Sequence, residues 1–344
     1  MWNHDRIHGL LAGAALGDAL GAPHEFRHTQ LPYTGRVEYR CRLLYRFQPQ
    51  RLLEVGQVTD DTEMMLTLTR RLVTDTGYTR DAVLLDYLSW ANSGCCMMGK
   101  NTRALFKGVT TVKGYSNRFR KQYELALDEV DDTTLPRDGW GQSNGALMRC
   151  APLAVLRAPY DAVKRDCRLT NPHPTCVLTN MVYIQAIRFA ASGMSNAELL
   201  ARLVDLSQAD SALHEVVVAA KLFHEGVDDG RTLCEDSSGG KRGKGWCLHG
   251  LYAALCALSF PTMSEALDWV IRDHPGSDTD TNACIAGALY GARVGYSGFD
   301  ARARDNFAIV RQCTTLKGEL PRDARYTLHD LDALVGGLEE LSRR

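Results

Sequence analysis

Two segments far apart in the chain carry glycine at every fourth position. The glycines are Gly9, Gly13, Gly17 and Gly21 in the first segment, and Gly287, Gly291 and Gly295 in the second. Residues four apart share one face of a helix, and each interior glycine costs a helix about 1 kcal/mol relative to alanine. A row of glycines therefore indicates a face on which another helix backbone lies very close. We predict that helices at 6–21 and 282–295 contact each other.

The rest of the chain has mainly helical periodicity, and convincing alternating strands are nearly absent. No linker divides it, and loops are expected at 131–145 and at the basic stretch 235–245. The predicted fold is all-α: a single compact orthogonal helical bundle with a metal-centred cleft, forming one domain over residues 1–344. Besides the two glycine-rich segments and a helix beginning near residue 60, the expected helices are 81–92, 102–108, 147–157, 176–192, 196–206, 211–225, 246–259, 263–272 and 328–341.

Composition narrows the functional classes. The 344 residues carry a net charge of −1, which argues against a dedicated nucleic-acid or membrane binder. No apolar run is long enough to span a bilayer, and the first residues do not resemble a secretory signal. The eleven cysteines form no Cys-x-x-Cys pair, so we interpret them as reduced core residues. We expect a cytoplasmic protein that acts as a monomer.

Two clusters of carboxylates and hydroxyls each precede an apolar helical stretch. They are Thr59, Asp60 and Asp61 in the first, and Asp278, Asp280 and Thr281 in the second. Each cluster alone could be an ordinary acidic helix cap. Together they would form an oxygen-only ligand set, which suits Mg²⁺, Mn²⁺ or Ca²⁺ better than Zn²⁺. Two such ions would neutralise carboxylates that otherwise repel one another. Asp18, on an apolar helix, is either a satisfied core group or a partner of this site.

A glycine-rich loop supplies a third candidate site. Residues 139–145, Gly-Trp-Gly-Gln-Ser-Asn-Gly, run directly into an apolar segment that we expect to be helical. Backbone N–H groups in such a loop can bind a diphosphate. The alternative is a simple turn followed by a capped helix.

These motifs, taken in order, resemble the ADP-ribosylglycohydrolase family, which includes dinitrogenase reductase-activating glycohydrolase. The resemblance covers most of the chain, from residue 9 to residue 295. Its four parts are Gly17–Glu25, Thr59–Thr62, Ser143–Pro152 and Gly276–Thr281.

The resemblance implies an all-α hydrolase with two divalent cations, Mg²⁺ or Mn²⁺. It implies that Glu25, Asp60 and Asp61 serve in proton transfer or gating, and that the stretch from Trp90 to Thr102 lines the cleft. The implied metal ligands are Thr59, Asp60, Asp61, Asp278, Asp280 and Thr281. The implied substrate-binding residues are Gly141, Gln142, Ser143, Asn144, Gly145, Asn171 and His173.

Two positions depart from the family pattern. Asn171 stands where the family commonly has histidine, with His173 two residues further on, and Met97 stands where arginine-directed members tend to carry aspartate. The implied activity is cleavage of the bond between ADP-ribose and an acceptor, which releases ADP-ribose. Arginine, serine, nucleic acid and a small molecule remain open as acceptors, nucleic acid only as a modified substrate. The alternatives are a catalytically altered ADP-ribose-binding protein of the same fold and a metal-dependent phosphohydrolase acting on ADP-ribose.

Overall fold

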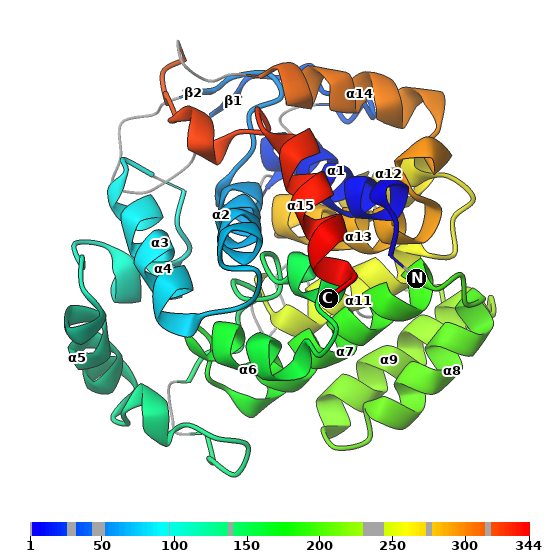
Figure 1. The fold of residues 1–344 in the computed structure, drawn as a ribbon. Helices are drawn as coiled ribbons and strands as arrows, with labels where there is room; N and C mark the ends of the chain where they lie inside the picture. Colours follow the sequence, from blue (N-terminus) through cyan, green and yellow to red (C-terminus); the bar gives the residue numbers. More distant parts are fainter. Residues whose placement is uncertain are drawn as a thin grey trace.

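The protein is an all-α assembly (Figure 1), as expected from its periodicity. This computed structural model describes residues 2–25, 32–42, 52–95, 97–136, 140–229, 244–272, 277–313 and 318–344. Within these residues the only sheet is an antiparallel pair of two-residue strands, β1 (Cys41–Arg42) and β2 (Leu52–Leu53). The α-helices are α1 (His4–Gly21), α2 (Asp60–Asp75), α3 (Arg80–Asn92), α4 (Lys100–Phe106), α5 (Val112–Tyr123), α6 (Tyr160–Arg168), α7 (Pro174–Ala191), α8 (Asn196–Leu206), α9 (Ser211–His224), α11 (Cys247–Ala257), α12 (Met263–Arg272), α13 (Thr279–Val294), α14 (Ala301–Gln312) and α15 (Leu331–Ser342). The 3₁₀ helices are η1 (Ala22–His24), η2 (Leu127–Glu129), η3 (Ala151–Val155), η4 (Tyr296–Gly298) and η5 (Ala324–Tyr326).

Helices α1 and α13 lie side by side at the centre of the fold (Figure 1). Their glycine rows face each other, which confirms the predicted contact. A Cβ atom on Gly13 would lie 2.1 Å from the Gly287 carbonyl oxygen, and one on Gly9 would lie 2.3 Å from that of Gly291. Real Cβ atoms do not approach backbone this closely, so only glycine permits the observed spacing of the two helices.

The remaining helices pack around this pair and bring together the acidic first turns of α2 and α13. Helices α7, α11 and α12 pack on α13, whereas α2, α14 and α15 pack against α1. The hydroxyl of Thr279 donates to the carbonyl oxygen of Gly21 at 2.9 Å, so α13 begins where α1 ends. Asp18, one turn before the end of α1, hydrogen-bonds to Thr59 and Thr62 at the start of α2. The first turns of α2 and α13 therefore lie at the same end of α1.

Among the described residues, one expected helix does not form, and three helices are present that the sequence analysis does not predict. Residues 147–157 do not form an α-helix but turns followed by the short η3. The reason is Pro152, which lacks an N–H and whose ring clashes with the preceding helical turn. Helices α5, α6 and α14 were missed because their buried faces are short or aromatic. In α5, for example, the buried face consists only of Tyr115, Phe119 and Tyr123.

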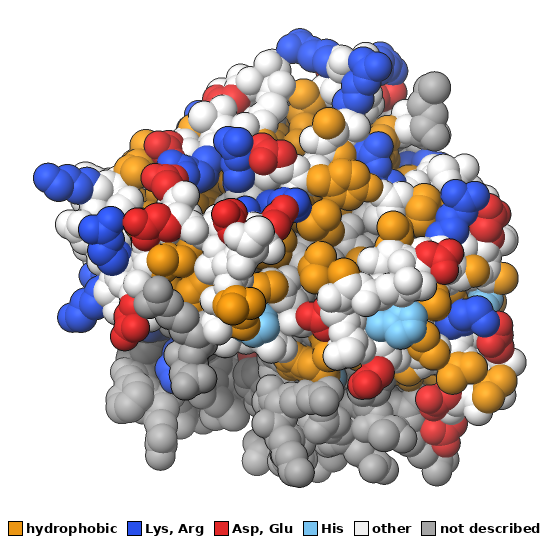
Figure 2. Space-filling view, turned by 90° about the horizontal axis from the view of Figure 1, so that it is seen from below, with side chains coloured by type: hydrophobic (Ala, Val, Ile, Leu, Met, Phe, Trp, Pro, Cys, Tyr) orange, Lys and Arg blue, Asp and Glu red, His pale blue; other side chains and the backbone are white. Residues whose placement is uncertain are grey.

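The surface carries both signs of charge. On the face seen in Figure 2, acidic and basic side chains are interspersed, and hydrophobic side chains occur in small groups. Among the described residues, no helix combines the length and apolarity that crossing a bilayer requires.

Candidate active site

The first acidic turn is held in place by Asp18, whose carboxylate is fully buried. Asp18 Oδ2 accepts the backbone N–H of Thr59 at 3.0 Å and the hydroxyl of Thr62 at 2.6 Å, and Oδ1 lies 2.8 Å from Thr59 Oγ1. It therefore caps α2 from another helix, in the role that an N-cap side chain normally plays. Burial raises the pKa of Asp18, while these hydrogen bonds oppose the rise. Asp18 is thus both a satisfied core group and the support of Asp60 and Asp61.

The second acidic turn is the start of α13, where Asp278 is the N-cap residue. Asp280 Oδ1 accepts the N–H of Thr281 at 2.8 Å. Carboxylate oxygens of Asp278, Asp280 and Glu25 all lie within 4.8 Å of one another. Glu25 follows η1, so the end of α1 delivers it to the same place.

The two turns meet, as the sequence predicts. Burial raises the pKa of Asp60 well above its ordinary value, and the charges of Asp61 and Asp18 raise it further. Burial also raises the pKa of Asp61, to which the charges of Asp18 and Asp278 contribute. The pKa of Asp280 is raised by burial first and then by the charge of Glu25. These repulsions arise because carboxylates from the two halves of the chain border the same buried region of low dielectric.

The donor set fits divalent cations. Every side chain supplied by the two turns and by Glu25 offers oxygen alone, the ligand that Mg²⁺ and Mn²⁺ prefer. Asp61 Oδ1 is buried and has no hydrogen-bond partner among the described residues. A buried carboxylate oxygen without a donor is costly, and a cation would satisfy it. A cation would also relieve the repulsion that raises the carboxylate pKa values.

The carboxylates line one wall of a cavity of about 970 Å³. This volume lies at the upper end of the range typical of small-molecule sites. All the predicted metal ligands, Glu25 and the loop Gly141–Gly145 border it. Its lining residues are Glu25, Thr59, Asp60, Asp61, Met97, Gly99, Lys100, Asn101, Thr102, Trp140, Gly141, Gln142, Ser143, Asn144, Gly145, Met148, Ala212, Lys244, Gly245, Trp246, Asp278, Asp280 and Thr281.

The loop Gly141–Gly145 is held by residues from another part of the chain. Ser143 forms an antiparallel bridge with Trp246. The backbone N–H of Asn144 donates to Gly245 O at 2.9 Å, and the N–H of Cys247 donates to Gln142 O at 2.9 Å. The expectation that this loop leads directly into an α-helix is wrong, so a helix N-terminus does not supply its N–H groups. Gly139, the first residue of the motif, lies outside the described residues.

Asn171 and His173 do not line the cavity but contact the loop from behind. Asn171 is fully buried, and its Nδ2 donates to Ser143 O at 3.0 Å and to Ser143 Oγ at 2.8 Å. The hydroxyl of Thr170 donates to Asn171 Oδ1 at 2.7 Å, which orients the amide. In turn, Arg149 Nη1 donates to Thr170 Oγ1 at 2.9 Å and to Gly145 O at 2.8 Å. Asn171 and Arg149 thus set the shape of the loop.

His173 contacts the loop through Gln142. The indole N–H of Trp246 donates to Gln142 Oε1 at 2.8 Å, so the Gln142 amide nitrogen faces His173 Nε2 at 3.2 Å. The backbone N–H of Thr175 lies 3.2 Å from His173 Nδ1. Burial lowers the pKa of His173, although the charge of Asp210 opposes the shift. Burial therefore favours the neutral imidazole, which can accept from one of these two groups, whereas the cation could accept from neither.

Several lining residues were not among the predicted site residues. The pairing of Ser143 with Trp246 brings Lys244, Gly245 and Trp246 to the cavity. Ala212, another lining residue, is the second residue of α9. No local pattern marks these residues, because their place depends on contacts across about 100 residues of chain. Residues 235–243 of the predicted basic loop lie outside the described residues. In the predicted 90–102 stretch, Met97 and Gly99–Thr102 border the cavity, whereas Trp90 is buried behind it.

Comparison with known proteins relates this arrangement to one family. A family model described as ADP-ribosylglycohydrolase matches residues 3–331. An ADP-ribosyl-[dinitrogen reductase] glycohydrolase from Rhodospirillum rubrum is 31% identical over 178 residues, which is 50% of this chain and 53% of that protein. This match therefore spans about half the length of that relative.

Two further matches extend over most of the chain. An ADP-ribosylarginine hydrolase, Tri1 of Pseudomonas putida (strain GB-1), is 26% identical over 344 residues, which cover 97% of this chain and 82% of the relative. A solved structure, titled ADP-ribosylglycohydrolase-related protein complex, superposes with a TM-score of 0.68 at 24% identity and covers 98% of both chains. At this level of identity the structural match establishes the fold alone.

Proposed function

The chain belongs to the ADP-ribosylglycohydrolase family of glycosidase-type hydrolases, and we propose that it cleaves the glycosidic bond between ADP-ribose and an acceptor in a metal-dependent reaction. One observation carries this proposal. The turn bearing Asp60 and Asp61 and the turn bearing Asp278 and Asp280 border a single cavity, together with the loop Gly141–Gly145. A cluster of carboxylates next to a glycine-containing loop suits a ligand that has both a sugar diol and a diphosphate.

Six side chains would hold two divalent cations, Mg²⁺ or Mn²⁺. When bound, such cations supply electrostatic stabilisation of developing negative charge and lower the pKa of water. The buried, unpartnered Asp61 Oδ1 supports this assignment. The six are Thr59, Asp60, Asp61, Asp278, Asp280 and Thr281.

The protein's own groups have two further tasks in the proposed reaction. Buried carboxylates stabilise the positive charge that develops on the ribose as the bond to the acceptor breaks. Glu25, Asp60 and Asp61 are the candidates for moving a proton from the attacking water to the departing acceptor. Glu25 is half-buried, so it combines contact with the cluster and access to solvent. The products are free ADP-ribose and the unmodified acceptor.

The loop Gly141–Gly145 is proposed to bind the diphosphate and ribose of the substrate. Its side-chain contacts with Asn171 and Trp246 hold the backbone in one conformation, which lowers the entropic cost of binding. Trp140, next to this loop, also borders the cavity.

The decisive experiment identifies the product. The chain is incubated with arginine-linked, serine-linked, nucleic-acid-linked and small-molecule ADP-ribose conjugates in Mg²⁺, in Mn²⁺ and in EDTA. Mass spectrometry is expected to detect free ADP-ribose only when a divalent cation is present, and the panel identifies the acceptor. Release of AMP would instead establish a phosphohydrolase, and tight binding without turnover of any conjugate would establish an altered binding protein.

We also propose that the chain acts as a single domain and a monomer in a reducing compartment such as the cytoplasm. The cysteines that the structure describes are free thiols, most of them buried, which supports the reducing compartment.

A further inference from the structure

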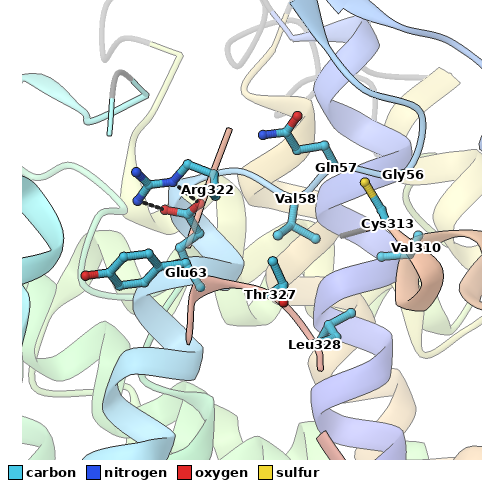
Figure 3. A pocket seen from close by; sticks show the side chains of 10 residues that line it. Gly56, Gln57, Val58, Glu63, Val310, Cys313, Arg322, Thr327 and Leu328 are labelled. Atoms are coloured by element: carbon cyan, nitrogen blue, oxygen red, sulfur yellow. Dashed lines mark hydrogen bonds and ion pairs between the residues drawn. The ribbon is translucent and has the colours of Figure 1, made fainter. Parts of the chain in front are cut away.

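The C-terminal part of the chain inserts one arginine behind the acidic cluster. Arg322 is 5% exposed, and its guanidinium donates from Nε to Glu63 Oε1 and from Nη2 to Glu63 Oε2, both at 2.7 Å. Figure 3 shows this two-pronged ion pair, with Arg322 reaching from its own segment to α2. The adjoining cavity, of about 10 Å³, has room for at most one water molecule, so it is not itself a ligand site.

The same guanidinium holds a second element. Arg322 Nη1 donates to Ser93 O at 3.0 Å, and Nη2 lies 3.1 Å from Ser93 Oγ. Ser93 is the residue that ends α3. The indole N–H of Trp90, also at the end of α3, donates to Glu63 Oε2 at 2.7 Å. Arg322 therefore clamps the first turn of α2 to the end of α3.

Both clamped elements continue into the walls of the active-site cavity. Glu63 lies two residues after Asp61, in the first turn of α2. The same turn carries Asp60 and Asp61, which border the cavity. Ser93 begins the connection to α4, in which Met97 and Gly99 border the cavity. A shift of Arg322 would therefore move the carboxylates of Asp60 and Asp61 relative to the cavity residues between α3 and α4.

Stability alone does not account for this ion pair. Moving two charges from water into a protein interior costs about as much as the pair regains, and apolar replacements are often neutral. What a two-pronged arginine–carboxylate pair does provide is a defined orientation. Groups that orient metal ligands without touching the metal typically affect affinity by about 10- to 100-fold when they are removed.

We propose that Arg322 is a positioning residue of the cation site. Through Glu63 it holds the helical turn that carries Asp60 and Asp61, and through Ser93 it holds the neighbouring cavity wall. This inference rests on the proposed function, because it presupposes that those carboxylates bind divalent cations.

The chain offers a matched control on the same helix. Arg70 also lies on α2 and also bonds the C-terminal segment, donating from Nε to Asp330 Oδ2 at 2.9 Å and from Nη2 to Thr327 O at 2.9 Å. It lies about two and a half turns after Asp61 on the helix and borders no part of the cavity. A lysine at either position keeps the charge but loses the two-pronged geometry.

The test measures Mn²⁺ binding by electron paramagnetic resonance and calorimetry, with thermal unfolding measured in parallel. Arg322→Lys is expected to weaken Mn²⁺ binding by about 10-fold or more, whereas Arg70→Lys should leave it within about 2-fold. Both variants are expected to unfold at a lower temperature than the wild type, so affinity rather than stability separates them. If Arg322→Lys does not fold, Glu63→Gln breaks the same ion pair with a side chain of the same shape and carries the same expectation.

Two outcomes would overturn the inference alone: unchanged Mn²⁺ affinity in a folded Arg322→Lys protein, or an equal loss in Arg70→Lys. Failure of the wild-type chain to bind Mn²⁺ at all would overturn the proposed function and this inference with it. The wild-type measurement therefore distinguishes the two failures.

Discussion

The side-chain Nδ2 of Asn144 donates a hydrogen bond to Asp278 Oδ2 at 2.8 Å, across 134 residues of sequence. This contact joins the loop proposed to bind the diphosphate to the cluster proposed to bind the cations. Both residues are buried, and Gly245 lies so close that a Cβ there would be 3.0 Å from Asp278 Oδ2. The proposed cation site and the proposed substrate loop are therefore joined as one unit, and changes in either should affect both.

Asn144→Ala is expected to lower kcat/KM and Mn²⁺ affinity by about 10- to 100-fold, because Asp278 loses the donor that orients it. Steady-state kinetics over a range of Mn²⁺ concentrations would measure this. The matched control is Asn117→Ala, on the exposed face of α5, which should behave as the wild type. Wild-type kinetics for Asn144→Ala would show that the contact has no functional part.

Asp278→Asn is expected to lower activity by more than about 100-fold while the fold is retained, since a ligand should matter more than the groups that orient ligands. Mn²⁺ at 100 times its dissociation constant should stabilise the wild type by about 2.7 kcal/mol, which thermal unfolding would detect and EDTA would reverse. The variant should lose most of this stabilisation. In EDTA it should unfold no earlier than the wild type, because burial raises the pKa of Asp278 and its charge opposes folding. Asp300→Asn, at the start of α14, serves as the control and should keep the Mn²⁺ effect.

Gly13→Ala is expected to destabilise the protein by about 1–3 kcal/mol or more, as overpacking does. The added Cβ would lie 2.1 Å from the carbonyl oxygen of Gly287, so α1 and α13 would have to separate. Gly336→Ala is the control, because nothing lies within 4 Å of a Cβ at that position of α15. It should stabilise by up to about 1 kcal/mol, through helix propensity. Urea unfolding of the two variants measures both effects, and similar values for them would contradict the close packing.

Protonation of His173 is expected to weaken substrate binding at acid pH. Burial lowers the pKa of His173 below its ordinary value of 6.5, so the unfolded chain takes up this proton at a higher pH than the folded protein does. The folded protein is therefore stabilised by keeping His173 neutral. This stabilisation is complete above pH 6.5 and is lost as the pH falls below that value. Protonated His173 would carry an N–H on both ring nitrogens, so it could no longer accept from the backbone N–H of Thr175 or from the Gln142 amide.

The measurement is KM against pH at saturating Mn²⁺ for the wild type and His173→Asn. The wild-type KM should rise more steeply on acidification than that of the variant. The charge of Asp210 raises the pKa of His173, so Asp210→Asn should move the rise in KM to a lower pH than in the wild type. Parallel pH profiles in all three proteins would exclude a role for His173 in this dependence.

Much of the site follows from local patterns. The acidic turns, the loop Gly141–Gly145 and Glu25 are short stretches whose residue types indicate cation and anion binding wherever they lie. The contact between the two halves of the chain could also be inferred. Two helices with glycine at every fourth position are well suited to pack closely against each other. The predicted helix at 147–157 does not form, because Pro152 interrupts the apolar periodicity on which that prediction depends.

For other residues, either the position in the site or the role could not be found in this way. Asn171 and His173 are predicted substrate-binding residues, yet the structure places them behind the loop, bonded to Ser143 and Gln142. Trp246 borders the cavity only because a bridge to Ser143 brings it there. Arg322 looks like any other arginine in the sequence, and its burial against Glu63 is visible only in the folded chain.

The sequence by itself determined the helical class, the close pair α1 and α13, and the acidic turns, because helix periodicity and glycine spacing act through neighbouring residues. The tertiary structure alone decided which side chains support those turns. Hydrogen bonds such as Asn144 to Asp278 and Arg322 to Glu63 join residues that are 134 and 259 positions apart. Such bonds depend on how whole helices pack, and no local pattern encodes that.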